Sequence, residues 1–170
     1  DEYSELPVID YGNQIIIPGL IDLHMHAPQY SFRGLGMDLE LLEWLETNTF
    51  PEEAKFASLE YAEKSYRIFT NNLKRSATTR ACVFATIHRD ATILLMDRLE
   101  ESGLVTMVGK VNMDRNSPDY LREESYQVSA DETVKWLLQT ANKEYRNTSP
   151  ILTPRFTPSC TDMLMNELNK

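Results

Sequence analysis

The sequence predicts an α/β fold in which parallel strands alternate with helices. Short β-branched, apolar runs alternate with longer amphipathic stretches along the 170 residues. The repeated order of strand and helix implies parallel strands joined by right-handed crossovers. No GxGxxG loop follows the first strand, which disfavours a doubly wound open sheet and favours a (β/α) barrel.

The length limits how much of a barrel the chain can form. A closed (β/α)8 barrel of the TIM type takes roughly 250 residues, and about four strand–helix units are visible here. The chain therefore forms either a compact four-stranded sheet or the first half of a larger barrel. We favour the half barrel.

The first predicted elements are a strand and a short helix. Ile15 to Leu23 is apolar and rich in isoleucine, which is typical of a buried strand. Asp38 can cap a short helix, because Leu39, Leu42 and Leu45 follow it at helical spacing.

Two more helices are predicted before the second strand. Pro51 suits the first turn of one helix, and the two glutamates after it suit the positive end of that helix. Five apolar residues then recur at steps of three and four and predict one buried helix face: Leu59, Ala62, Tyr66, Phe69 and Leu73.

The middle of the chain reads as strand, helix, strand and loop. Thr78 to Ile87 is short and β-branched, and it predicts the second strand. Asp90 to Ser102 has an apolar helical face, and Gly103 ends that helix. Val105 to Met113 predicts a third strand, and Asp114 to Gln127 is mainly a loop.

The last part of the chain supplies the fourth strand and two helices. Pro150 to Thr153 predicts the short strand. Two serines, each with an acidic residue three positions later, can open the helices: Ser129 with Glu132, and Ser159 with Asp162. The first of these helices is expected to run to about Tyr145.

Composition and charge restrict the class of function. The chain is 42% hydrophobic and 25% charged, as in a folded protein, and its formal net charge is -9. An acidic surface repels phosphate groups, so we expect neither nucleic-acid binding nor docking on an anionic membrane. The densest basic stretch, Lys74-Arg75 with Arg80 nearby, is interpreted as a solvated helix end.

Cysteine usage and the apolar runs bear on the compartment. Cys82 and Cys160 are the two cysteines, belong to no CxxC pair, and are expected to be free thiols in a reducing environment rather than metal ligands. The apolar run near the start is broken by Pro18 and Gly19 and lacks a basic leader, so it predicts neither a transmembrane helix nor a signal peptide. The sequence therefore predicts a cytoplasmic protein.

A pair of histidines follows the first predicted strand. Side chains of residues i and i+2 lie on one face of a strand, so His24 and His26 project together, with Asp22 on the same face. Two neutral imidazoles in this position can bind one metal ion. They can equally belong to a half-exposed strand, and the residues alone leave both interpretations open.

One further histidine is present for a third ligand. His88 ends the second predicted strand and is expected at the same edge of the sheet. It can complete a metal site, contact a substrate, or be an ordinary loop residue, and we favour the last two roles over metal binding.

The segment "PGLIDLHMH" resembles the signature PG-[LFM]-[IV]-D-x-H-x-H of the amidohydrolase superfamily. Pro18, Gly19, Asp22, His24 and His26 match it. The series that follows, "HAPQYSFRGLGMDLELLEWLETNTFPEE", "CVFATIH", "VGKVNMD" and "PILTPRFTPSC", resembles the guanine deaminase family within this superfamily.

The resemblance implies a set of site residues. His24 and His26 would be zinc ligands, and Gln29 would bind the purine with its amide group. Arg155 would donate to purine acceptors and Phe156 would pack on the ring, although an ordinary ion pair and a core position remain alternative roles for them. His88 remains a candidate for substrate contact.

The resemblance also implies the reaction and what these residues do not supply. Zinc activates water for attack on the carbon that bears the amino group of guanine, which gives xanthine and ammonia. The other metal ligands of the family, including an aspartate, and its proton-transferring glutamate have no counterpart here. We therefore expect residues 15–170 to be a partial hydrolase barrel that is inactive in isolation, as part of a cytoplasmic enzyme that forms a homodimer.

Two points remain open beside this resemblance. Residues 1–14 would be a linker or the end of a small β-sandwich domain, whose last strand would lie near Ile9 to Ile17. The function could also be that of another aminohydrolase of the superfamily acting on a related heterocycle, or of a non-catalytic half-barrel scaffold.

Overall fold

The computed structural model describes residues 4–170 and contains the predicted parallel α/β fold. Its main sheet has four parallel strands in the order β1-β2-β3-β5. The strands are β1 (Leu20–His26), β2 (Thr78–Phe84), β3 (Val105–Gly109) and β5 (Thr148–Pro150). Strands adjacent in the sheet follow one another along the chain, as in one arc of a barrel wall.

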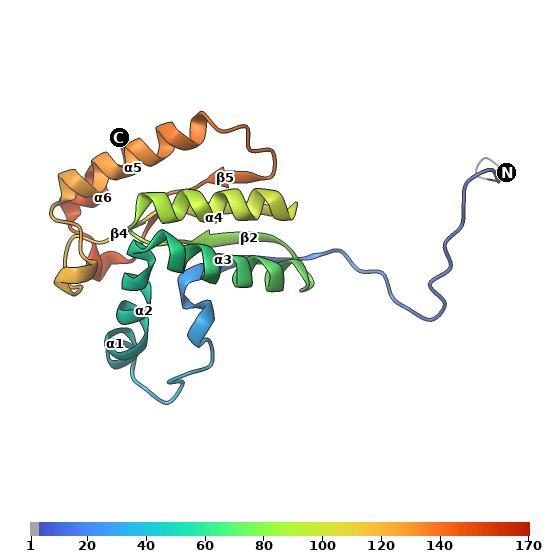
Figure 1. The fold of residues 1–170 in the computed structure, drawn as a ribbon, viewed down its shortest axis with the longest axis horizontal. Helices are drawn as coiled ribbons and strands as arrows, with labels where there is room; N and C mark the ends of the chain where they lie inside the picture. The colour runs from blue at the N-terminus through green and yellow to red at the C-terminus, as the bar shows by residue number, and fades with distance from the viewer. Residues whose placement is uncertain (1–3) are drawn as a thin grey trace.

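Three helices cover one face of this sheet: α3 (Leu59–Lys74), α4 (Arg89–Ser102) and α5 (Tyr126–Ala141). Figure 1 shows α3 and α4 side by side in front of β2, with α5 next to α4. The main core lies between these layers, where Tyr66, Val83, Leu95 and Trp136 are fully buried. The α3 face was predicted correctly except at Leu59, which is half exposed.

The first strand begins later than predicted. Ile15 to Ile17 are exposed and unpaired, and β1 starts at Leu20, after Gly19. A Cβ at Gly19 would lie 2.2 Å from Thr79 Oγ1, so only glycine permits this close approach. Hydrophobicity alone could not indicate where pairing with β2 begins.

The segment before β1 leads away from the sheet, as Figure 1 shows. Among residues 4–17 the structure has no strand, and Ile9 to Ile17 carry exposed apolar side chains. Residues 1–3 of the 1–14 segment lie outside the described part of the chain. Its assignment as a linker or the end of a β-sandwich domain stays a prediction.

The segment after β1 is helical but begins differently from the prediction. A 3-10 turn over Ala27–Phe32 follows the strand, and α1 (Leu41–Trp44) starts after Glu40, so the prediction that Asp38 caps it is wrong. A π-helical turn over Leu45–Thr49 connects α1 to α2 (Phe50–Ala54). The predicted place of Pro51, in the first turn of α2, is confirmed.

The third and fourth predicted strands are each interrupted. β3 ends at Gly109, and the chain continues as β4 (Val111–Asn112), which pairs with β6 (Thr153–Pro154) in a separate two-stranded sheet. At the break, a Cβ at Gly109 would lie 2.1 Å from Thr153 Oγ1. The apolar pattern continues through Gly109 and therefore does not indicate the break. The glycine allows Thr153 to pack closely at this point.

Two helix starts were placed on the wrong serine. α5 begins after Ser125, whose hydroxyl accepts from the Val128 N–H, and Ser129 lies buried inside the helix. α6 (Asp162–Leu168) begins after Thr161, not Ser159. The end of α4 before Gly103, which has a φ of 76°, was predicted correctly.

The carboxyl ends of the strands lie at one edge of the fold. His26 pairs in register with Phe84, and Phe84 with Gly109. A second core cluster of Leu45, Phe50, Val111, Met113 and Leu121 lies among the elements that follow these strand ends. Among residues 4–170 no helix is both long and apolar enough to cross a bilayer.

Candidate active site

His24 and His26 lie together at the carboxyl end of β1. Their ring centroids are 5.1 Å apart, and each lies 4.7 Å from the ring of Phe84 on the neighbouring strand. Asp22 accepts a hydrogen bond from the backbone N–H of His24 at 3.0 Å, which restrains the backbone at the first histidine. Both imidazoles therefore project to one side, as the strand alternation predicts.

The imidazole of His26 is held in its neutral form. Burial, and then the positive charges of Arg155 and His24, lower its pKa to about 3. Its Nδ1 is buried and makes no hydrogen bond within the described residues. A neutral imidazole with an uncommitted nitrogen is the form that binds a metal ion.

Gln29 and Arg155 are joined by a residue that the sequence did not indicate. Gln29 lies on the 3-10 turn after β1, and its Nε2 donates to Oε1 of Glu53 at 3.1 Å. Arg155 follows β6, and its Nη1 donates to Oε2 of the same carboxylate. Glu53 was interpreted only as a charge at a helix start, since no local pattern distinguishes it from Glu52.

One cavity of about 560 Å³ brings these residues together. Its lining consists of nine residues: His24, Met25, His26, Gln29, Leu41, Trp44, Leu45, Arg155 and Phe156. Phe156 is 36% exposed, so its ring is accessible to a ligand. Five of the six predicted site residues therefore line one space.

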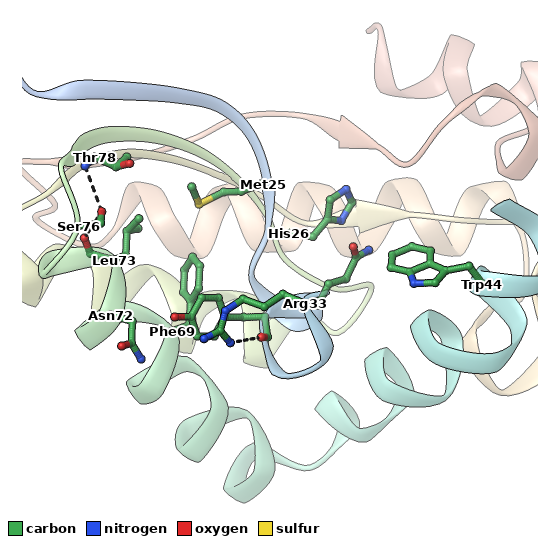
Figure 2. Close-up of a pocket in the computed structure, with 11 residues that line it drawn as sticks. Met25, His26, Arg33, Trp44, Phe69, Asn72, Leu73, Ser76 and Thr78 are labelled. Atoms are coloured by element: carbon green, nitrogen blue, oxygen red, sulfur yellow. Dashed lines mark hydrogen bonds between the residues drawn. The ribbon is translucent and has the colours of Figure 1, made fainter. Parts of the chain in front are cut away.

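A second cavity of about 400 Å³ shares four lining residues with the first: Met25, His26, Gln29 and Trp44. Figure 2 shows His26 and Trp44 at one end of it and Ser76 and Thr78 at the other. Met25 and the α3 side chains of Phe69 and Leu73 lie between them. This space follows β1 toward the start of the sheet and is mostly apolar.

His88 lies outside the shared cavity. It precedes α4 and lines a separate cavity with Arg89 and Glu132. Burial and then the charge of Lys110 lower the pKa of His88, and its Nε2 makes no hydrogen bond within the described residues. The structure does not bring His88 together with the other predicted site residues.

The chain matches the amidohydrolase family over residues 15–170. The chain belongs to this family. A guanine deaminase from Dictyostelium discoideum is 47% identical over 158 residues, which cover 93% of this chain and 35% of that relative. The human guanine deaminase is 43% identical, with 92% of this chain and 34% of the relative covered.

Solved structures agree with this assignment. The crystal structure of a guanine deaminase from C. acetobutylicum, with guanine bound in its active site, matches with a TM-score of 0.92 and 50% identity. The match covers 99% of this amidohydrolase chain and 40% of that one. The chain thus spans about a third of the length of the curated relatives it matches.

The described residues do not form a complete metal site on their own. Within residues 4–170, no group of three or more His, Cys, Asp or Glu side chains is placed to hold an ion. Catalytic zinc usually has three protein ligands. Cys160 is buried and donates to the carbonyl of Asn112 at 3.2 Å, and Cys82 is a free thiol on β2.

Proposed function

We propose that the full-length protein containing this chain is a guanine deaminase. The reaction breaks the bond between the purine carbon and its amino group and forms a carbon–oxygen bond with water, so that guanine becomes xanthine and ammonia leaves. The observation that carries the proposal is that His24, His26, Gln29, Arg155 and Phe156 line one cavity. The similarity to guanine deaminases over more than nine-tenths of the chain supports it.

His24 and His26 are suitable ligands for a zinc ion. Their rings are 5.1 Å apart, and the buried Nδ1 of His26 has no partner in the described residues. When bound, zinc supplies a site that lowers the pKa of water and makes it nucleophilic near neutral pH. The remaining ligands would come from residues other than these two.

The other cavity residues hold the substrate. Gln29 and Arg155 offer an amide and a guanidinium to the polar edge of the ring, and Phe156 offers its face for stacking. Leu41 and Trp44 add apolar surface to the lining of the cavity, against which a flat ring can pack. Proton transfer to the leaving ammonia is not assigned to any of these residues.

An ultraviolet assay on the full-length protein tests this proposal. We expect loss of guanine absorbance, appearance of xanthine, inactivation by a chelator and recovery with zinc. Gln29→Ala and Arg155→Ala should each reduce kcat/KM by tenfold or more, since each removes a polar contact to the ring.

The other outcomes identify the alternatives. Turnover of an oxidised guanine or a triazine in preference to guanine would favour another aminohydrolase of the family. No turnover with any heterocycle, and a binding function that survives the chelator, would favour a scaffold. The homodimer and the cytoplasmic location stay predictions, and size measurement and fractionation test them.

A further inference from the structure

Glu53 lies behind the two polar groups of the cavity. It is 1% exposed, and each of its carboxylate oxygens accepts one hydrogen bond, from Gln29 and from Arg155 respectively. Glu53 itself does not line the cavity. It can therefore act on a ligand only through the residues that it holds.

The contact with Glu53 fixes the orientation of the Gln29 amide. A carboxylate only accepts hydrogen bonds, so the amide must turn its NH2 group toward Glu53. The carbonyl oxygen Oε1 is then left for the cavity. An acceptor in this position selects a ligand that presents an N–H donor.

The contact with Arg155 fixes the charge of the site. The side chains of Arg155 and Glu53 are 4% and 1% exposed and form an ion pair. Because Glu53 already neutralises the buried guanidinium of Arg155, an anionic ligand gains little attraction from it. Arg155 therefore serves as a hydrogen-bond donor to a neutral acceptor such as a ring carbonyl.

We propose that Glu53 is a positioning residue that makes this cavity select a neutral, flat heterocycle with an N–H donor toward Gln29 and a carbonyl toward Arg155. It also makes the cavity reject anionic rings of the same shape. The identity of the heterocycle rests on the proposed function, and guanine has both groups. Urate, an oxopurine that is an anion at neutral pH, is the matched ligand that should be rejected.

The test compares Glu53→Gln with Glu52→Gln in the full-length protein. Glu52 is the adjacent buried glutamate, but it accepts hydrogen bonds from Ser31, Lys55 and Tyr61, whereas Gln29 and Arg155 donate to Glu53. We expect Glu53→Gln to raise KM for guanine about tenfold or more, with a smaller change in kcat. It should also strengthen inhibition by urate relative to guanine binding, because the charge of Arg155 is no longer compensated.

Glu52→Gln should leave the preference for guanine over urate as in the unmodified protein. Glu53→Asp, which keeps the charge but not the reach, should raise KM and still reject urate. If Glu53→Gln and Glu52→Gln have the same KM for guanine and the same inhibition by urate, the proposal is overturned. If both Glu53 variants fail to fold, Gln29→Glu is the second test: two facing carboxylates should abolish guanine turnover, and unchanged turnover would overturn the proposal.

The two proposals can fail separately. If the unmodified protein does not convert guanine, the proposed function fails, and calorimetry with neutral and anionic purines still tests the role of Glu53. Equal affinity for guanine and urate in the unmodified protein would overturn the role of Glu53 while leaving the deaminase activity in place.

Discussion

Arg155 and Glu53 form a buried ion pair although 102 residues separate them in the sequence. The pair ties the segment after β6 to α2, and its Arg155 member lines the cavity. Its two side chains come from elements that do not belong to the same strand–helix unit. The site thus depends on tertiary contacts as well as on the histidine motif.

Removing one member of this pair should destabilise the protein. Glu53→Ala leaves the Arg155 guanidinium buried without a counter charge, and we expect a loss of about 3–5 kcal/mol in the free energy of unfolding. Urea denaturation followed by circular dichroism measures it. The double variant Glu53→Ala/Arg155→Leu should lose less than Glu53→Ala alone, and an equal loss would contradict the explanation.

The two serines near the start of α5 should differ in their effect. Ser125→Ala removes a helix cap and should cost about 1 kcal/mol of unfolding free energy. Ser129 is buried, donates to Glu123 and accepts from Asn112 at 2.8 Å, so Ser129→Ala should cost more, about 1–3 kcal/mol for each group left unpaired. The same denaturation measurement compares them, and a larger loss for Ser125→Ala would contradict the buried network.

Glu100 should make stability depend on acidic pH. Burial raises its pKa, but hydrogen bonds from the backbone N–H groups of Arg146, Asn147 and Thr148 outweigh burial, and the net pKa is lowered. A lowered pKa means that the stabilisation is full above the unfolded value and is lost as pH falls through the folded one.

The melting temperatures of the unmodified protein and Glu100→Gln test this dependence. The difference between them should be largest near pH 7 and should shrink as the pH falls through the lowered folded-state pKa of Glu100, below which the carboxyl group is protonated in both folded and unfolded chains. A difference that stays constant over this range would contradict the role of the charge.

The histidine pair should control the metal content of the full-length protein. His24→Ala and His26→Ala should each lower bound zinc from about one ion per chain to a small fraction of that value. Elemental analysis by mass spectrometry measures it. Cys82→Ser is the matched control, because this thiol is partly exposed on β2 and should leave the zinc content unchanged.

Local sequence patterns were sufficient for much of the fold. The apolar stripe of α3, the glycine stop after α4 and the alternation of strands and helices depend on neighbours within a few residues. The predicted half barrel is confirmed by the parallel order of the strands and by the similarity to amidohydrolases. His24 and His26 were predicted to lie together for the same reason, because a strand alone fixes which side chains share a face.

Local patterns could not decide between chemically equivalent positions. Ser125 and Ser129 can both cap a helix, and the buried partners of Ser129 determine that α5 starts at the earlier serine. The break after Gly109 likewise depends on how closely Thr153 approaches from another strand.

The sequence by itself determined the order of the elements and the position of the histidine pair, because both follow from side-chain periodicity. Only the tertiary structure decided that Gln29 and Arg155 share the Glu53 carboxylate and that His88 lies outside their cavity. The physical reason is that a buried carboxylate takes its hydrogen-bond partners from whatever the fold places beside it. The spacing of residues along the chain therefore does not predict which side chains donate to Glu53.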